Sequence, residues 1–299
     1  MSSLFAQPRI DSVSSFCSFL QTVDVLRLDL LHPAVSGNKW FKLKEYIKAA
    51  KAEGKTALLT FGGAYSNHIV ATAAAAQLTG MKSVGVIRGE ETKVPSHTLL
   101  AAKNYGMQLC FVSREAYRGK AVPTEVFLKH NRNDICTIPE GGYGALGVQG
   151  ASSILYQNET NFYTHILCAV GTGTTLAGLI KAASPQQKII GIPVLKNAFS
   201  LQQEIQNLLP REKHDAFELL WDYHFGGYAK YTADLLNFMN EFYGQTKIPT
   251  DFVYTGKAFF AAFDLMKKNY FPPGSRLLLI HTGGLQGNAS LKKGTLIFD

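Results

Sequence analysis

The stretch THILCAVGTGTTLAGLIKAA, residues 164–183, contains the pattern that decides the fold. Residues 164–170 are almost continuously apolar, as in a strand that is buried on both faces of a sheet. The glycine- and threonine-rich residues 171–178 follow, and residues 175–183 have the pattern of a helix. A strand that leads through a glycine-rich loop into a helix is the repeating unit of a parallel α/β sheet.

The same unit recurs along the chain. Short apolar or alternating runs predict further strands at 24–31, 56–61, 83–88, 107–112, 134–138, 188–194 and 276–282. Helical patterns alternate with them at 40–53, 67–79, 96–106, 146–157, 201–209, 233–244 and 256–269. This alternation predicts an α/β fold with mainly parallel sheets that helices cover on both faces.

Composition places the chain among ordinary globular proteins. It has 299 residues, of which 46% are apolar and 17% are charged, enough for one large or two medium domains. The net charge is +8, but the lysines and arginines are scattered rather than clustered on one segment. We therefore expect no nucleic-acid partner, whereas an anionic small substrate or cofactor suits the mild basic bias.

Cysteine use and apolar runs bear on location. Cys17, Cys110, Cys136 and Cys168 lie far apart and form no zinc-binding pattern, so we expect buried free thiols and no metal site. Free thiols are typical of a reducing cytoplasm. No basic and apolar leader opens the sequence, and no apolar run reaches the length of about 18 residues that a membrane span needs. We expect a cytoplasmic protein that makes no membrane contact.

Four loops that follow predicted strands are rich in glycine and small polar residues. They read GGAYSNH at 62–68, PEGGYGALG at 139–147, GTGTTLAG at 171–178 and HTGGLQG at 281–287. Ligands of parallel α/β sheets bind at the carboxyl ends of the strands, where these loops lie. Four such loops predict a site for a polar ligand that the backbone approaches closely.

The loop at 171–178 has the chemistry of a phosphate site. Backbone N–H groups at a helix start, together with threonine hydroxyls, suit a phosphate. The loop lacks the Gly-Lys-Ser/Thr ending of a nucleotide-binding loop, and no acidic residue follows at the spacing of a dinucleotide fold. A monophosphate therefore fits best. A tight turn with helix caps is the structural alternative, and a Rossmann-type oxidoreductase would rest on this loop alone.

Ser66 and Asn67 stand at a predicted helix start. Either could be a simple N-cap, or the helix end could bind a carboxylate while Asn67 hydrogen-bonds a second group. The next residue, His68, is expected to be an exposed or hydrogen-bonded helix residue rather than a catalyst.

Three further loop residues are candidates. Tyr254 directly precedes a helix predicted from Gly256, so it is either a core aromatic beside a capping Thr255 or part of a site. Thr282 follows the last strand, and Tyr228 lies in the glycine-rich HFGGYAKYT.

Lys39 follows the turn signal Ser36-Gly37-Asn38 at the start of a predicted helix. A lysine there can be a surface charge, an anion clamp or a nucleophile. A phosphate cradle without nucleotide machinery, tyrosines in glycine-rich loops and a carboxylate-binding helix end favour the third role. Together these features suit pyridoxal 5'-phosphate held as a Schiff base on Lys39.

Six motifs give the sequence a resemblance to a known family. They are SGNKWFKL, GAYSNH, IPEGGYGALGVQG, GTGTTLAG, VYTGKA and HTGG, and their order and spacing agree from about residue 24 to residue 286. The sequence resembles the 1-aminocyclopropane-1-carboxylate (ACC) deaminase and D-cysteine desulfhydrase family. These are pyridoxal-phosphate enzymes of the tryptophan synthase β type, or fold type II.

The resemblance implies roles for the candidate residues. Lys39 would bond the cofactor and move the substrate's α-proton, and Asn67 would bond the cofactor's 3-hydroxyl. Ser66, with nearby helix N–H groups, would hold the substrate carboxylate, beside His68. The phosphate would be cupped by Gly171, Thr172, Gly173, Thr174 and Thr175.

Two tyrosines and two threonines complete the implied site. Tyr254 would lie against the cofactor ring, and Tyr228 would face the substrate. Either Thr255 or Thr282 would meet the pyridine nitrogen. The catalytic set implied in this way is Lys39, Ser66, Tyr228 and Tyr254.

The resemblance also implies an architecture. A large cofactor domain would combine 1–43 with 152–299, and a smaller α/β domain would span 44–151. Each would be an open, twisted, mainly parallel sheet, with the cofactor in the cleft between them. Homodimers and small amino-acid substrates are usual in this family.

The threonines at positions 255 and 282 indicate which of the family's substrates this chain uses. ACC deaminases carry Glu and Leu at the matching positions, whereas D-cysteine desulfhydrases carry Thr, as this chain does. A hydroxyl leaves the pyridine nitrogen largely neutral and the ring a weaker electron sink. Elimination of sulfide from D-cysteine is therefore favoured, and opening of the cyclopropane ring of ACC is the alternative. Departures such as Trp40 also leave room for a homologue that binds the cofactor without lyase turnover.

Overall fold

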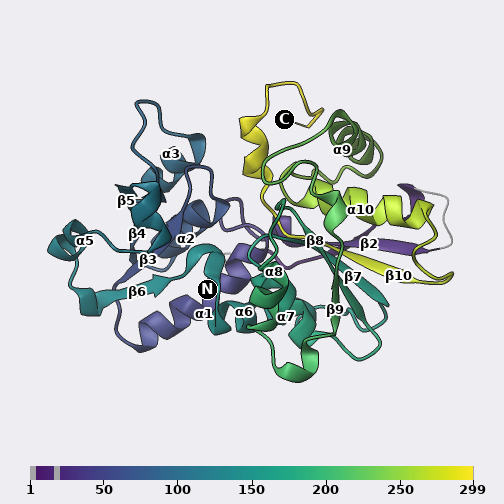
Figure 1. Cartoon of the computed structure of the whole chain (residues 1–299), viewed down its shortest axis with the longest axis horizontal. Helices are drawn as coiled ribbons and strands as arrows, with labels where there is room; N and C mark the ends of the chain where they lie inside the picture. Colours follow the sequence, from purple (N-terminus) through teal and green to yellow (C-terminus); the bar gives the residue numbers. More distant parts are fainter. Residues whose placement is uncertain (1–4, 17–20, 299) are drawn as a thin grey trace. The chain divides into compact units, whose positions relative to one another are not determined.

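The computed structural model describes residues 5–16 and 21–298, which form two compact units. One unit combines both ends of the chain, up to Asn38 and from Ala151 onward, and the other is the continuous segment Lys39–Gly150. Each unit contains one sheet of mostly parallel strands with helices against it, so the predicted α/β fold is confirmed (Figure 1). The division into domains at 43/44 and 151/152 stays a prediction.

The unit built from both chain ends contains a six-stranded sheet in the order β1-β2-β10-β7-β8-β9. Only the pair β1 and β2 is antiparallel, and the other neighbours are parallel. The strands are β1 Ile10–Ser12, β2 Thr22–Arg27, β7 His165–Val170, β8 Lys188–Pro193, β9 Phe217–Leu219 and β10 Arg276–His281.

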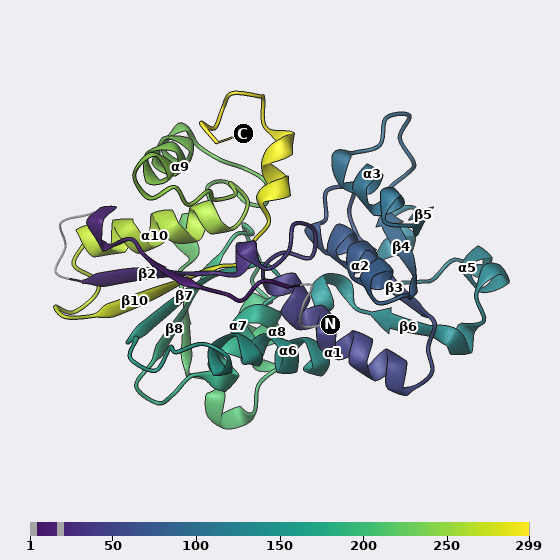
Figure 2. The same cartoon turned by 180° about the vertical axis from the view of Figure 1, so that it is seen from behind.

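Helices cover both faces of this sheet. Helix α10 lies on one face and α7 on the other, as both views show (Figures 1 and 2). The face under α10 is a hydrophobic core, where Phe259 and Phe263 pack in one cluster with Leu167, Ile190 and Leu279. The helices of this unit are α7 Thr174–Ala182, α8 Leu201–Gln206, α9 Ala233–Thr246 and α10 Thr255–Lys267, with α6 Ala145–Tyr156 running across the boundary between the units.

The continuous unit has a four-stranded, wholly parallel sheet in the order β5-β4-β3-β6. Helices α2 and α3 supply the core on one face, and α4 and α5 supply it on the other. The strands are β3 Ala57–Gly62, β4 Lys82–Arg88, β5 Met107–Val112 and β6 Ile135–Ile138. The helices are α1 Asn38–Ala52, α2 Asn67–Leu78, α3 His97–Asn104, α4 Arg114–Arg118 and α5 Thr124–Lys129.

The strand predicted at 24–31 is wrong in its second half. Strand β2 ends at Arg27, and a 3₁₀ turn occupies Leu28–Leu30. The Arg27 guanidinium donates two hydrogen bonds, of 2.8 and 2.6 Å, to the carboxylate of Asp29, and both side chains are buried. The ion pair joins the last residue of β2 to the turn that follows it.

Short elements escaped the sequence pattern. The two edge strands β1 and β9 have three residues each, and the helices α4 and α5 have five and six, which is too little chain to establish a period. Helix α8 ends at Gln206, three residues before its predicted end.

Two of the predicted buried thiols are buried in the structure. Cys110 and Cys168 are buried and free. Cys136 is free but only half-buried, and it lies on the edge strand β6, which pairs with β3 alone. Cys17 lies outside the described residues. None of the helices in 5–16 and 21–298 is long and apolar enough to cross a membrane.

Candidate active site

The turn before Lys39 packs backbone to backbone against the loop after β10. Gly37 has φ +65°, and a Cβ there would lie 1.9 Å from the carbonyl oxygen of Thr282, so only glycine fits. The Asn38 N–H donates to that same oxygen at 3.3 Å, and the Asn38 side-chain amide donates to Thr175 Oγ1 at 2.7 Å. The residue that precedes Lys39 is therefore fixed to two of the predicted glycine-rich loops.

The loop at 171–175 leads into α7 as a phosphate site requires. Gly173 has φ +79°, and a Cβ there would lie 2.5 Å from Ile205, so glycine is again needed. Among the described residues, the backbone N–H groups of Thr172 and Gly173 have no acceptor. The Thr172 and Thr174 hydroxyls lie 3.2 Å apart. The helix start thus presents unused donors beside two hydroxyls, which suits an anion with several oxygens.

The start of α10 is built around a buried carboxylate that the sequence analysis missed. Asp251 Oδ2 accepts from the N–H groups of Val253 and Tyr254, and Oδ1 accepts from the N–H and the hydroxyl of Thr255, all at 2.7–3.0 Å. Burial raises the pKa of Asp251, although these hydrogen bonds and the charge of His281 oppose the rise. Helix α10 begins at Thr255 rather than at the predicted Gly256, because this cap satisfies its first N–H groups.

The two candidate tyrosines lie together on this unit. The ring of Tyr254 packs on Gly171, where an added Cβ would meet it at 3.3 Å. The rings of Tyr228 and Tyr254 meet edge to face with centroids 6.1 Å apart. Tyr228 is exposed and Tyr254 is half-buried, so both present surface to a ligand.

The loop that carries Asp251 is itself held by two side chains. The Asn288 amide donates to Thr250 O at 2.9 Å and accepts from Phe252 N–H at 3.2 Å. His281 lies with Nε2 2.7 Å from Pro249 O and Nδ1 3.4 Å from a carboxylate oxygen of Asp29. Burial raises the pKa of Asp29, but His281 and Arg27 outweigh it and lower the pKa overall.

In the continuous unit, Ser66 precedes α2 and Asn67 is its first residue. Neither side chain caps the helix by a hydrogen bond. Ser66 occupies the N-cap position but makes no side-chain cap hydrogen bond. The Asn67 amide likewise has no hydrogen bond to any part of the chain that the structure describes, and both residues are half-buried. The simple N-cap interpretation of Ser66 is therefore wrong, and two polar groups remain available for a ligand at a helix N-terminus.

His68 is buried with one ring nitrogen unsatisfied. Its Nε2 lies 2.9 Å from the Thr60 hydroxyl, which donates its own proton to Ile138 O, so Nε2 carries the hydrogen. Within 5–16 and 21–298, Nδ1 has no partner. Burial, followed by the positive charges of Lys42 and Lys39, moves the pKa of His68 well below its usual value. The expected exposed or fully hydrogen-bonded histidine is corrected to a neutral one with an unused acceptor.

Lys39 is the second residue of α1 and is half-buried. Its charge acts on His68, and Lys42, one turn further along, donates to Gly141 O in the glycine-rich loop after β6. The continuous unit thus brings Lys39, Ser66, Asn67 and His68 to loops that follow its own strands. In the other unit, Asn38 bonds to both Thr175 and Thr282, and Tyr254 packs on Gly171 and meets Tyr228.

Comparisons with known proteins identify the family. Residues 20–283 match the family described as pyridoxal-phosphate dependent enzyme. The chain belongs to this family. It is 30% identical over 281 residues to a putative ACC deaminase of Pyrococcus horikoshii, covering 89% of this chain and 85% of the relative. It is 29% identical over 284 residues to the D-cysteine desulfhydrase of Klebsiella pneumoniae subsp. pneumoniae, covering 87% and 86%.

A solved structure supports the same conclusion. The crystal structure of an ACC deaminase homologue superposes with a TM-score of 0.81 at 28% identity and covers 95% of this chain and 91% of that one. The resemblance to the ACC deaminase and D-cysteine desulfhydrase family is confirmed. The protein is a pyridoxal-phosphate-dependent enzyme.

The residues of this pyridoxal-phosphate-dependent enzyme fit its cofactor. A phosphate would find unused N–H donors at Thr172 and Gly173, and the ring of Tyr254, which packs on Gly171 beside them, could lie against the cofactor's ring. An aldehyde needs an amine such as that of Lys39, and a phenolic oxygen needs a donor such as the amide of Asn67.

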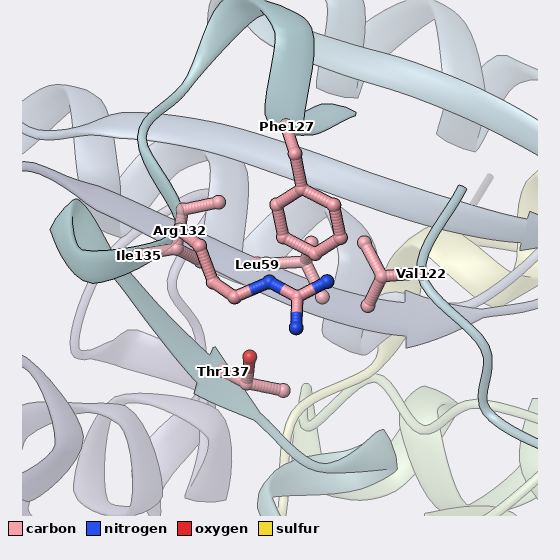
Figure 3. Close-up of a pocket in the computed structure, with 6 residues that line it drawn as sticks. All are labelled: Leu59, Val122, Phe127, Arg132, Ile135 and Thr137. Atoms are coloured by element: carbon pink, nitrogen blue, oxygen red, sulfur yellow. The ribbon is translucent and has the colours of Figure 1, made fainter. Parts of the chain in front are cut away.

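A pocket elsewhere in the enzyme has a different character. It has a volume of about 330 Å³ and lies on the continuous unit, beside β3 and β6 (Figure 3). Its guanidinium, from Arg132, lies over the ring of Phe127 at 4.2 Å. None of the predicted site residues is among its lining, which consists of Leu59, Val122, Phe127, Arg132, Ile135 and Thr137.

The residues that hold the enzyme's loops were not among the predicted site residues. Asn38, Asp251, Lys257, His281 and Asn288 lie inside or beside the quoted motifs, yet no role was assigned to them. Only Asp251 has a local signal, an acidic residue just before a helical pattern.

Proposed function

We propose that the enzyme is a lyase or deaminase that releases ammonia from a small amino acid, with D-cysteine as the preferred substrate. The products would be pyruvate, sulfide and ammonia. Relatives named D-cysteine desulfhydrase and putative ACC deaminase support the general class. We also propose that the enzyme is a cytoplasmic homodimer.

The preference for D-cysteine over ACC rests on the hydroxyl of Thr282. The Thr255 hydroxyl is committed to Asp251, to which it donates at 2.7 Å while accepting from the Asp251 N–H at 2.8 Å. Thr282 is a buried residue, and its hydroxyl has no hydrogen bond to a residue that the structure describes. We therefore assign the pyridine nitrogen to Thr282. A neutral hydroxyl favours elimination of a good leaving group over ring opening.

Each remaining side chain has a proposed task. When bound, the cofactor withdraws electrons from the bonds of the substrate's α-carbon. Lys39 would hold the cofactor's aldehyde carbon until the substrate's amine displaces it there, and the freed amine of Lys39 would then accept the α-proton. Ser66 and the N-terminus of α2 bind the substrate carboxylate, where its charge meets the positive end of the helix.

His68 and Tyr228 complete the proposed substrate site. His68 is neutral, so its Nδ1 can accept a hydrogen bond but adds no positive charge beside Lys39. A neutral His68 does not help Lys39 to lose its proton as a cationic neighbour would. Desolvation and the cofactor are therefore left to set the basicity of Lys39. Tyr228 covers the substrate from its exposed loop.

The experiment is a spectrum of the purified protein supplied with cofactor, taken before and after D-cysteine, with pyruvate and sulfide assayed in the same sample. We expect a visible band of the bound cofactor that shifts with D-cysteine, and product from the wild type only. Lys39→Ala should lose both the band and turnover. Lys48→Ala, an exposed lysine of the same helix, is the matched control and should behave as wild type.

Two outcomes would redirect the proposal. A cofactor band that D-cysteine leaves unchanged, with 2-oxobutanoate formed from ACC, would establish the ACC deaminase alternative. A band without turnover on a panel of D- and L-amino acids would make the protein a cofactor-binding homologue without lyase activity.

A further inference from the structure

Lys257 is a completely buried lysine for which the proposed function has no use. It is the third residue of α10, and its side chain is 0% exposed. A buried ammonium is unfavourable unless it is fully hydrogen-bonded. Its Nζ donates to the backbone oxygen of His224 at 2.8 Å and to that of Gly227 at 2.7 Å. Burial lowers the pKa of Lys257 to about 8, against the opposing charge of Asp251.

The turn that this ammonium binds has an unusual backbone. Phe225, Gly226 and Gly227 have φ values of +51°, +89° and +116°, and Ala229 has +53°. Left-handed conformations are unfavourable for residues other than glycine, so Phe225 and Ala229 need an external constraint.

The turn's own hydrogen bonds do not supply the whole of that constraint. The Gly226 N–H donates to His224 Nδ1 at 2.9 Å, and the Gly227 N–H donates to His224 O at 3.0 Å. The Gly227 carbonyl oxygen also accepts from the Lys230 N–H at 3.1 Å, and Lys257 gives this oxygen and that of His224 a second donor, which comes from outside the turn. The ammonium is therefore the group that ties the turn to α10.

Tyr228 is the next residue along the chain. Its ring meets that of Tyr254, which lies one turn before Lys257 at the start of the same helix. The segment 251–257 thus supports both tyrosines: Tyr254 through the backbone that Asp251 caps, and Tyr228 through the side chain of Lys257.

We propose that Lys257 is a positioning residue that fixes Tyr228 for the substrate by clamping the 224–227 turn. This inference rests on the proposed function for the part that Tyr228 has in substrate binding. The clamp itself is a property of the polypeptide and is present without cofactor. An ammonium suits it because a cation on α10 donates charge-assisted hydrogen bonds to two convergent carbonyl oxygens, which a methionine of similar length cannot do.

The clamp is tested by hydrogen exchange of the amides of residues 226–230 in the cofactor-free protein. Lys257→Met should raise their exchange rates by about tenfold or more while the strands keep their protection. Lys267→Met, an exposed lysine at the other end of α10, is the matched control and should change nothing. Unchanged exchange at 226–230 in a folded Lys257→Met protein would overturn the proposal.

Chemical rescue separates a clamp from a mere packing role. In Lys257→Ala, added methylammonium should restore protection of 226–230 by at least about threefold, because a small cation can occupy the space of the lost ammonium. Tetramethylammonium, which has no N–H donor, should not. Should Lys257→Met fail to fold, Lys257→Ala refolded in methylammonium replaces it. Protection that persists after methylammonium is removed would contradict the clamp.

Kinetics then connect the clamp to the substrate. With D-cysteine, Lys257→Met should raise KM by about tenfold with a smaller change in kcat, and methylammonium should reverse part of the change in Lys257→Ala. If the wild type turns over no amino acid, the proposed function fails. The exchange experiment still decides whether the clamp exists, so the two failures are distinguishable.

Discussion

At the scale of the residue, two buried charges of opposite sign lie within seven positions of each other. Asp251 is surrounded by N–H donors and Lys257 by carbonyl acceptors, so each is satisfied by backbone rather than by the other. Burial shifts the pKa of both toward the neutral form. Such charges contribute less to stability than to the shape of the backbone that they bind, which is what a binding site requires.

The lowered pKa of Lys257 makes a signed prediction about stability. Between pH 8 and about 10.5 the unfolded chain holds a proton on this lysine that the folded chain does not, so stability rises with pH in that window. Relative to Lys257→Met, the free energy of unfolding of the wild type should increase by up to about 3 kcal/mol from pH 7 to pH 10.5.

Urea denaturation of both cofactor-free proteins at several pH values measures this difference. Because the two proteins share every other titrating group, those contributions cancel. A difference that stays constant over the range would mean that Lys257 titrates as an ordinary exposed lysine.

Sequence could predict single residues only where the neighbours in the chain supply the signal. The candidate status of Lys39, Ser66 and Asn67 follows from a turn or a glycine loop directly before a helix. The partners of Lys257 and Asn288 lie 30 and 38 positions away, and a distance in sequence of that size leaves no local trace. The unused state of the Ser66 hydroxyl is likewise visible only in three dimensions.

At the scale of the element, two helices of the same unit begin with serine but use it differently. Ser96, at the start of α3, accepts from the Leu99 N–H at 3.2 Å and donates to Ala64 O. Ser66, at the start of α2, makes no such bond. The same residue type at the same helix position thus stabilises one helix and leaves the other with an unused hydroxyl.

This contrast gives a paired prediction. Ser96→Ala should lower the free energy of unfolding by about 1 kcal/mol and leave turnover unchanged. Ser66→Ala should change stability by less than about 0.5 kcal/mol but lower kcat/KM for D-cysteine by about tenfold or more. Denaturant unfolding and steady-state kinetics on both variants make the comparison. Equal losses of stability would show that Ser66 caps α2 after all, and unchanged kinetics would remove it from the substrate site.

Among the elements, long buried strands were predictable and short edge elements were not. Strands β3, β4, β7 and β10 are buried over five or more consecutive residues and are mostly apolar there, because both of their faces are covered. Glycine-rich loops follow β3, β7 and β10, and the structure shows close contacts at their glycines. The end of β2 at Arg27 was missed, because residues 28–30 continue the alternating pattern and no glycine or proline marks the 3₁₀ turn that they form.

At the scale of the whole molecule, the ends of the continuous unit meet within that unit. Gly150, in α6, lies against the backbone of Phe41, in α1, and an added Cβ would be 1.9 Å from the Phe41 carbonyl oxygen. The contact is between main chains, so neither side can adjust by changing a rotamer. A segment whose two ends are joined in this way can be inserted into another chain without leaving its own fold, as the family resemblance implies for 44–151.

Gly150→Ala tests how much this junction matters. We expect it to lower the free energy of unfolding by about 3 kcal/mol, because α6 and α1 would have to separate. Lys39 lies two residues before Phe41, so cofactor retention should fall as well. Gly244→Ala is the matched control: Gly244 lies inside α9 with nothing within 4 Å of its would-be Cβ, and the substitution should stabilise by about 0.5–1 kcal/mol. Urea unfolding without cofactor measures both, since bound ligand would mask the difference by mass action. A Gly150→Ala protein as stable as the wild type would mean that the helices adjust freely at this contact and that the junction does not hold Lys39 in place.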